Sequence, residues 1–120
     1  MILHITSKQE WADAQSKGEY TAPSLAAEGF IHFSTDKQAV NVANAFYSGR
    51  TDLVLLLVDE SRLKPELKWE PPAGPPADNI SEADLFPHVY GPVNLDAVAS
   101  VLDFQPDPAT GAFTLPNLGN

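Results

Sequence analysis

Three histidines are the residues of this sequence best suited to chemistry, and all three lie in short apolar segments. His4 stands in MILHIT, His32 in EGFIHFST and His88 in FPHVYGP. Each segment has the pattern of a β-strand, whereas histidines without a role would scatter into loops. An imidazole titrates near neutral pH, accepts or donates protons and binds metal ions. The pattern therefore indicates that several strands present imidazoles to one site.

Polar side chains beside these histidines extend the candidate site. Thr6 shares a strand face with His4, and Ser34 shares one with His32 just before a predicted helix start. Free N–H groups of that helix start would point to the same place as the hydroxyl and the imidazole. The simpler interpretations also stay open: Ser34 as a helix cap, and each histidine as a core residue bonded to a carbonyl group.

A carboxylate and a phenol complete the set of candidates. Glu70 follows Trp69 at the start of a proline-rich stretch, where it could act as a general base or accept a hydrogen bond from a sugar hydroxyl. A solvated glutamate is an equal alternative. Tyr90 shares a strand face with His88, although a strand tyrosine most often serves packing.

Zinc binding is the main alternative use of three histidines. The sequence has no His-x-His or His-x-x-x-His pair and no cysteine. We therefore expect no tightly bound metal, although a site of scattered ligands stays open. A serine hydrolase is a weaker alternative, because there is no Gly-x-Ser-x-Gly elbow and Ser34 lies too near His32 on the same strand to pair with it.

Composition restricts the class of protein. The chain has 120 residues, 43% hydrophobic and 19% charged, which is typical of one globular domain over residues 1–120. A net charge of −9 without a basic cluster argues against nucleic-acid binding, while a helix start could still hold one phosphate. No apolar run has the length of a membrane span, and MILHIT lacks the features of a signal peptide. The absence of cysteine suits a cytoplasmic location.

Two early helices are predicted to position the candidate residues. Ser7 begins an S-K-Q-E capping box, so a helix should run over residues 8–17 and end at Gly18. Pro23 interrupts EYTAPSLAAEG, which favours a loop or one short helical turn there. Thr35 begins a T-D-K-Q capping box and a second helix that should end at Gly49. Its inward face would carry Ala39, Val42, Ala43 and Phe46.

The remaining predicted elements are strands. DLVLLLVDE is a continuous apolar run, typical of a central strand buried on both faces. Other strands are expected at residues 2–6 and 30–34 and in PHVYG, VASVLDF and AFTL. Residues 71–85 are rich in proline and are predicted to form a surface loop that orders over a ligand. The sum is an α+β domain.

Motifs along nearly the whole chain carry a resemblance to a known family. In order, they are LHIT, SLAAEGFIHFST, QAVNVANAFYSG, DLVLLLVD, LKWE, FPHVYGPVNLDAV and GAFTLP. They resemble a bacterial and plant family catalogued as domain of unknown function 952. That family resembles a compact, divergent member of the ADP-ribosyltransferase-like fold. The resemblance implies a split, strongly bent, mostly antiparallel sheet that grips NAD in a cleft.

The resemblance also implies roles for single residues. The first-strand histidine, His4, would bond a ribose hydroxyl and the nicotinamide region. His32, with Ser34 beside it, would lie near the nicotinamide ribose. Glu70 or His88 would stand in for the glutamate that the transferases use. The resulting expectation assigns catalysis to His32, Glu70 and His88, and ligand contacts to His4, Thr6, His32, Ser34 and Tyr90.

The function implied is an enzyme that binds NAD or an ADP-ribose-like nucleotide and makes or breaks a ribosyl bond, as a transferase or an NAD glycohydrolase. Such a protein mainly positions the ribose and stabilises a developing positive charge. The histidine-rich set also resembles the branch that removes a 2′-phosphate from RNA onto NAD, although the acidity of the chain disfavours RNA. Two alternatives stay open: a non-catalytic small-ligand-binding module on the same fold, and a three-histidine metal-dependent hydrolase.

Overall fold

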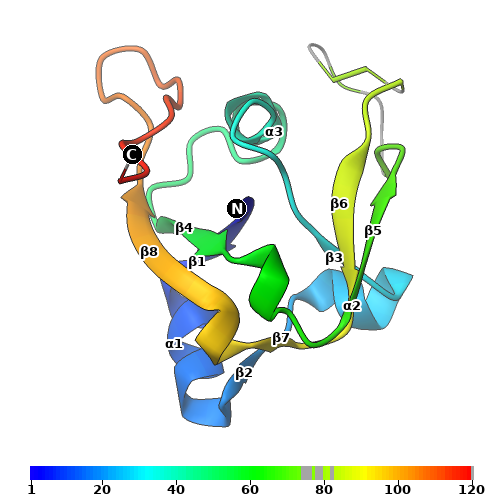
Figure 1. Cartoon of the computed structure of the whole chain (residues 1–120). Coiled ribbons are helices and arrows are strands. Elements are labelled where there is room, and N and C mark those ends of the chain that lie inside the picture. The colour runs from blue at the N-terminus through cyan, green and yellow to red at the C-terminus, as the bar shows by residue number, and fades with distance from the viewer. Residues whose placement is uncertain (74–76, 78–79, 82, 120) are drawn as a thin grey trace.

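Two three-stranded antiparallel sheets and one two-stranded sheet form the framework (Figure 1). The computed structural model describes residues 1–73, 77, 80–81 and 83–119, so the predicted loop at 71–85 lies partly outside the described residues. In this described part of the chain, three α-helices and two short 3₁₀ helices, at Glu60–Arg62 and Leu95–Ala97, connect the strands. The fold is therefore α+β, as predicted.

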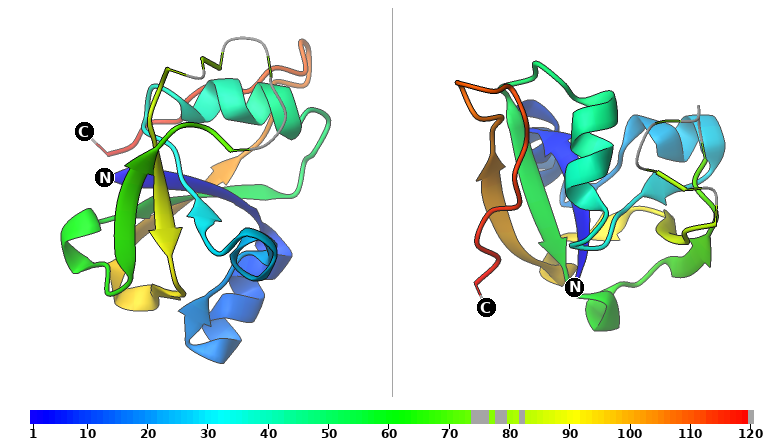
Figure 2. Two further views of the ribbon diagram at one scale, coloured as in Figure 1. Left: turned by 90° about the vertical axis from the view of Figure 1, so that its right-hand side faces the viewer. Right: turned by 90° about the horizontal axis from the view of Figure 1, so that it is seen from above.

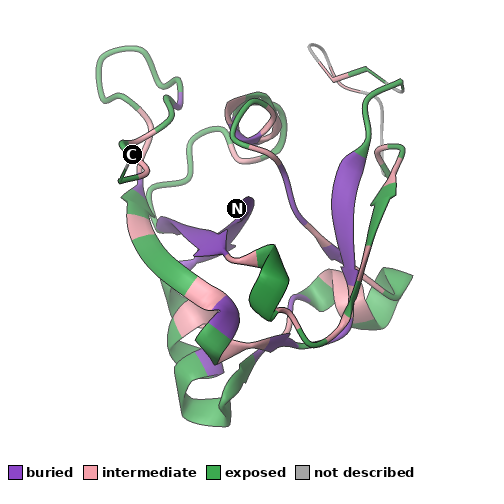
Figure 3. Ribbon diagram, viewed as in Figure 1, coloured by how far each residue is buried: buried purple, intermediate pink, exposed green. Residues whose placement is uncertain are grey.

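The first sheet has the order β1-β4-β8, with β1 at Ile2–Ser7, β4 at Leu53–Val58 and β8 at Val98–Phe104. Every residue of β4 is buried, which confirms the predicted central strand. Side chains alternate between the two faces of β1 and β4 and so supply two separate cores. Ile2 belongs to one core, while Leu3 and Ile5 belong to the other. Figure 3 shows this burial along β1 and β4, whereas β8 is largely exposed.

The second sheet has the order β3-β6-β5, with β3 at Ile31–His32, β6 at Phe86–Tyr90 and β5 at Glu66–Glu70. A backbone bridge between Leu3 and Ser34 joins the two sheets near one edge. The strand predicted at 30–34 therefore splits its pairing, because Ile31 and His32 pair with β6 and Ser34 pairs with β1. The antiparallel pairing agrees with the expectation of mostly antiparallel sheets.

The first helix, α1 at Lys8–Lys17, is confirmed with its caps. The Ser7 hydroxyl accepts the Glu10 backbone N–H at 3.0 Å, and Gly18 adopts a φ of 90° that favours glycine. Helix α1 leads into β2 at Glu19–Tyr20, which pairs with β7 at Val93–Asn94.

Helix α2 is the short helical alternative of the prediction, whereas α3 differs from the prediction. Pro23 begins α2, a helix of 6 residues at Pro23–Glu28, because a proline at the first helical position loses no hydrogen bond. Helix α3, at Ala39–Phe46, starts later than predicted, because the preceding residues form a turn in which Gln38 accepts the Thr35 N–H. It also ends before Gly49. Figures 1 and 2 show α3 across one end of the gap between the two sheets.

Two further expectations are wrong, and one strand is absent from the prediction. Phe46 is 47% exposed rather than inward, because it lies at the last turn of α3. AFTL forms no strand; Phe113 is buried there, and its N–H bonds to the Asn44 side chain instead of a neighbouring strand. Strand β5 was missed, because only intermediate and exposed residues make up this edge strand and prolines flank it.

Candidate functional site

A cavity of about 490 Å³ is lined by residues from both larger sheets and all three helices. This volume lies within the range of small-molecule sites. The lining contains most of the residues predicted for the site, namely His4, Thr6, His32, Ser34 and His88. Glu70 and Tyr90 are not part of the lining but contact His88.

His4 lies on β1 at the base of this cavity, with both ring nitrogens engaged by protein atoms. Nδ1 lies 2.5 Å from the His32 carbonyl oxygen, and Nε2 lies 2.7 Å from the Tyr20 hydroxyl. Since a carbonyl only accepts, Nδ1 carries the proton. Burial lowers the pKa of His4 to about 4, so the ring is neutral at pH 7 and Nε2 is an acceptor.

The hydrogen bonds continue from His4 to a carboxylate. The Tyr20 hydroxyl lies 2.9 Å from the Thr6 hydroxyl, which donates to Glu10 at 3.0 Å. Tyr20 is fully buried, and this burial raises the pKa of its phenol. Its single proton is shared between two acceptors, His4 Nε2 and Thr6 Oγ1. We call His4, Tyr20, Thr6 and Glu10 the His4 chain.

His32 sits at the rim of the cavity. Its Nε2 lies 2.8 Å from the Glu28 carboxylate at the end of α2, and both side chains are partly exposed, at 38% and 41%. Exposed pairs of this kind contribute little to stability. His32 is paired with His88 across β3 and β6, and the two rings lie 5.5 Å apart between centroids. The imidazole is therefore held at the mouth rather than in the core.

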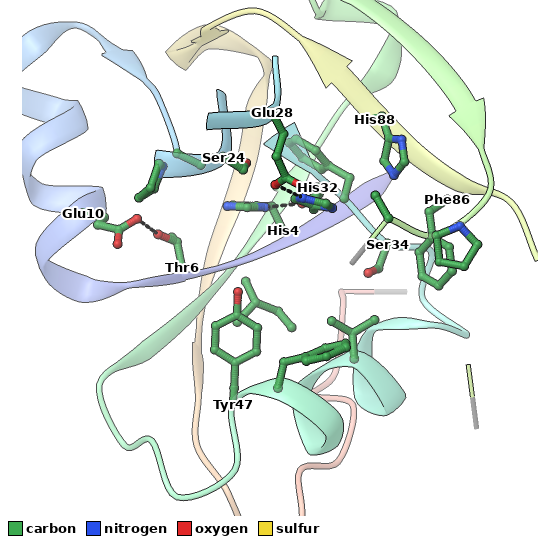
Figure 4. A pocket seen from close by; sticks show the side chains of 18 of the residues that line it. His4, Thr6, Glu10, Ser24, Glu28, His32, Ser34, Tyr47, Phe86 and His88 are labelled. Atoms are coloured by element: carbon green, nitrogen blue, oxygen red, sulfur yellow. Dashed lines mark hydrogen bonds and ion pairs between the residues drawn. The ribbon is translucent and has the colours of Figure 1, made fainter. Parts of the chain in front are cut away.

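His88 occupies a different environment on β6. Only 2% of the residue is exposed, and Phe30 stacks on the ring with 4.3 Å between centroids. Nδ1 lies 2.9 Å from Glu70 Oε1, and the Tyr90 hydroxyl donates to the same oxygen. The hydrogen bonds from Tyr90 and His88 lower the pKa of Glu70. Glu70 is thus a carboxylate that accepts from Nδ1–H, which leaves Nε2 as the acceptor of the neutral ring. Figure 4 shows this imidazole pointing into the cavity.

Two hydroxyl groups in the cavity make no hydrogen bond within the described part of the chain. Ser34 is 6% exposed and pairs with Leu3 only through its backbone, so it does not cap α3. Tyr47 follows α3 and directs its hydroxyl into the cavity (Figure 4). Both are available to a ligand.

Several lining residues were not predicted. Glu10 was interpreted only as a capping residue, and Tyr20 and Tyr47 gave no pattern that separates a site residue from a packing residue. Arg50 also lines the cavity, with its guanidinium bound to Asp52 at 2.8 and 2.9 Å. Only the folded arrangement brings these four side chains to the histidines.

No group of three or more His, Cys, Asp or Glu side chains among residues 1–73, 77, 80–81 and 83–119 is arranged to hold a metal ion. His4 contacts a carbonyl oxygen and a phenol, whereas His32 and His88 each contact a carboxylate. None of the described helices, of which α1 with 10 residues is the longest, has the length and hydrophobicity of a membrane span.

The fold and the cavity define a small α+β domain with antiparallel sheets and a histidine-lined pocket. The chain belongs to the family described as Protein of unknown function (DUF952), whose model matches residues 5–101. This confirms the family resemblance found in the motifs. The comparison with curated proteins gave no match.

Solved structures of one relative share this fold. The crystal structure of protein CC0527 from Caulobacter crescentus is 34% identical, covers 95% of this chain and 93% of that chain, and has a TM-score of 0.80. A crystal structure of its double methionine mutant is 33% identical over the same shares, with a TM-score of 0.79. Its solution NMR structure is 32% identical, covers 90% and 87% of the two chains, and has a TM-score of 0.72.

Proposed function

We propose that the cavity binds NAD or a related ADP-ribose-containing nucleotide and that the protein makes or breaks a ribosyl bond there. This proposal is supported by the convergence of His4, His32, Ser34 and His88 on one cavity of about 490 Å³. They come from strands β1, β3 and β6 of two sheets and from the segment that follows β3. The resemblance of the family to the ADP-ribosyltransferase-like fold supplies the ligand class.

The charge of the cavity supports a positively charged reacting centre. Two carboxylates, Glu10 and Glu28, line it against one guanidinium, Arg50, whose charge is already paired with Asp52. The nicotinamide ring of NAD is a cation, and cleavage of its glycosidic bond develops positive charge on the ribose. Carboxylates fixed near that charge favour the transition state.

The remaining lining suits the other parts of such a ligand. The free hydroxyls of Ser34 and Tyr47 can exchange hydrogen bonds with ribose hydroxyls. Phe46 and Phe86 offer apolar surface to a planar base, and Arg50 is the one described cation that lines the cavity and can meet a phosphate.

A non-catalytic ligand-binding module is the second candidate. It is favoured by the engagement of His4, whose two ring nitrogens both contact protein atoms, so that this histidine supports the cavity without transferring a proton. Turnover of NAD separates the two candidates.

The proposal is tested by nucleotide binding to wild type and Ser34→Ala. Titration calorimetry with NAD and ADP-ribose should give saturable binding. Ser34→Ala should weaken it several-fold, because a neutral hydrogen bond contributes about 0.5–1.5 kcal/mol. Ser48→Ala, an exposed serine outside the cavity, is the matched control and should bind as wild type. Absence of binding to either nucleotide would overturn the proposal.

A further inference from the structure

His88 is buried and also lines the cavity. The residue is 2% exposed, Phe30 covers one ring face, and Glu70 accepts a hydrogen bond from Nδ1. Nε2 makes no hydrogen bond to any described residue. Among these residues, every side-chain nitrogen or oxygen that is fully shielded from solvent has a hydrogen-bond partner, so Nε2 is not fully shielded. Nε2 is therefore accessible, and the ring points into the cavity (Figure 4).

Glu70 selects the tautomer of this imidazole. Because a carboxylate accepts, Nδ1 carries the proton of the neutral ring, and Nε2 then presents its lone pair to the cavity. Tyr90 donates to the same Glu70 oxygen and so holds the carboxylate in place. Hydrogen bonds from Tyr90 and His88 keep Glu70 ionised by lowering its pKa. A carboxylate behind an imidazole stabilises the imidazolium that forms when the ring takes a proton.

We propose that His88 is the general base of this site and that the acceptor it activates is water, which makes the protein a hydrolase of the nicotinamide–ribose bond. This rests on the proposed function. Glu70 and Tyr90 are positioning residues, because they act on the reaction only through His88.

The chemical step balances with water as the only co-reactant. The water oxygen bonds to C1 of the nicotinamide ribose, and the C1–nitrogen bond breaks with its electron pair passing to the ring nitrogen. The cationic pyridinium thereby leaves as neutral nicotinamide. The water proton passes to His88 Nε2, and the imidazolium later releases it to solvent. NAD⁺ and water thus give ADP-ribose, nicotinamide and one proton.

The enclosure of His88 favours water over a macromolecular acceptor. Any acceptor must reach Nε2 through a cavity of about 490 Å³ that the nucleotide itself occupies. Water is the smallest acceptor that can share this cavity with a nucleotide, whereas a side chain of another protein must enter with its backbone. The net charge of −9 further opposes a nucleic-acid acceptor.

The experiment measures NAD binding, NAD turnover and product composition in ¹⁸O-water. Wild type should release ADP-ribose that carries one ¹⁸O at C1. His88→Gln should lower turnover by about 10²–10⁴-fold, the usual contribution of a general base. Its affinity for NAD should stay within a few-fold of wild type, since Nε2 acts on water. Melting temperatures verify that the variant is folded.

Glu70→Gln supplies a second variant that does not alter the base itself. It should lower kcat and move the acid limb of the pH–rate profile to lower pH, because the imidazolium loses its anionic partner. A merely structural role for Glu70 would leave the profile in place. Glu66→Gln, on the same strand but 67% exposed and ion-paired with Lys68, should leave rate and profile unchanged.

The outcomes separate this inference from the proposed function. Turnover unaffected by His88→Gln, or a product without ¹⁸O, would overturn the inference and leave the proposed function standing. NAD binding without turnover would overturn the inference and the proposed ribosyl-bond chemistry, and would leave nucleotide binding standing. Failure of both NAD and ADP-ribose to bind would overturn the inference and the proposed function together.

Discussion

The environments of His4 and His88 differ although both histidines are buried on strands that line one cavity. His4 has a protein partner for each nitrogen, whereas His88 has a partner among the described residues for Nδ1 only. The side-chain partner of His4 is the neutral Tyr20 hydroxyl, which is linked through the Thr6 hydroxyl to the Glu10 carboxylate. Behind His88 a carboxylate is the direct partner. His4 is therefore a neutral residue that holds the cavity wall in place, whereas His88 is arranged to accept a proton.

Burial alone does not identify a reactive histidine in this protein. Burial without a charged partner makes protonation unfavourable, as the lowered pKa of His4 shows. His88 instead has a carboxylate as its direct partner, and its other nitrogen, which bonds to no described residue, lines the path to the ligand. Substitutions near His4 should therefore affect stability, and those near His88 should affect turnover.

The largest effect on stability expected from the His4 chain is its pH dependence. His4 has a pKa of about 4 in the folded protein against an ordinary 6.5, so the unfolded chain binds a proton that the folded chain does not. Stability should fall as pH falls from about 6.5 to 4, by about 3 kcal/mol at about 1.4 kcal/mol per pKa unit. Denaturant titrations across this range provide the measurement.

The control for this effect is His4→Gln, which lacks the titrating group. Carboxylates with lowered pKa values, such as Asp59 and Asp96, lose their contribution only at lower pH, so they do not account for the window above 4. An equal slope between pH 6.5 and 4 in wild type and His4→Gln would assign the effect to other groups.

Loss of the Tyr20 hydroxyl should have the next largest effect. Tyr20→Phe leaves His4 Nε2 without its buried partner and removes one contact of Thr6. A buried group left without a partner costs about 1–3 kcal/mol. Tyr47→Phe is the matched control, because the Tyr47 hydroxyl bonds to no described residue, and it should change stability by less than about 0.5 kcal/mol. Equal losses from the two variants would show that the His4 chain contributes nothing special.

Local signals account for the parts of the fold that the sequence predicts well. The α1 caps at Ser7 and Gly18 depend on neighbouring residues, and β4 needs only its continuous apolar run. Convergence of the histidines was also predictable, since strand alternation places His4 and His32 on defined faces. Their roles in function stay predictions.

Contacts distant in sequence account for what was missed. Tyr20 reaches His4 across 16 residues only because β2 pairs with β7, a pairing that no local pattern indicates. A proline disrupts a helix at an interior position but favours a helix at its first position. The sequence alone does not show which of these positions Pro23 occupies. Phe113 is buried by packing on Phe104, a contact for which a strand is not needed.

Substitution of His32, which lies between His4 and His88, should have the smallest effect on stability. Its side chain is 38% exposed and its partner is an exposed carboxylate, while the bond to His4 uses the His32 backbone carbonyl, which a substitution leaves in place. His32→Gln should therefore change stability by less than about 0.5 kcal/mol. If the imidazole contacts the nucleotide at the cavity mouth, affinity for NAD should fall several-fold. Paired melting and calorimetry measure both quantities, with Glu28→Gln as a variant that removes only the partner of the imidazole. A large loss of melting temperature with unchanged affinity would instead make His32 a structural residue, and the ligand-binding surface would then be confined to the side of the cavity formed by Ser34 and His88.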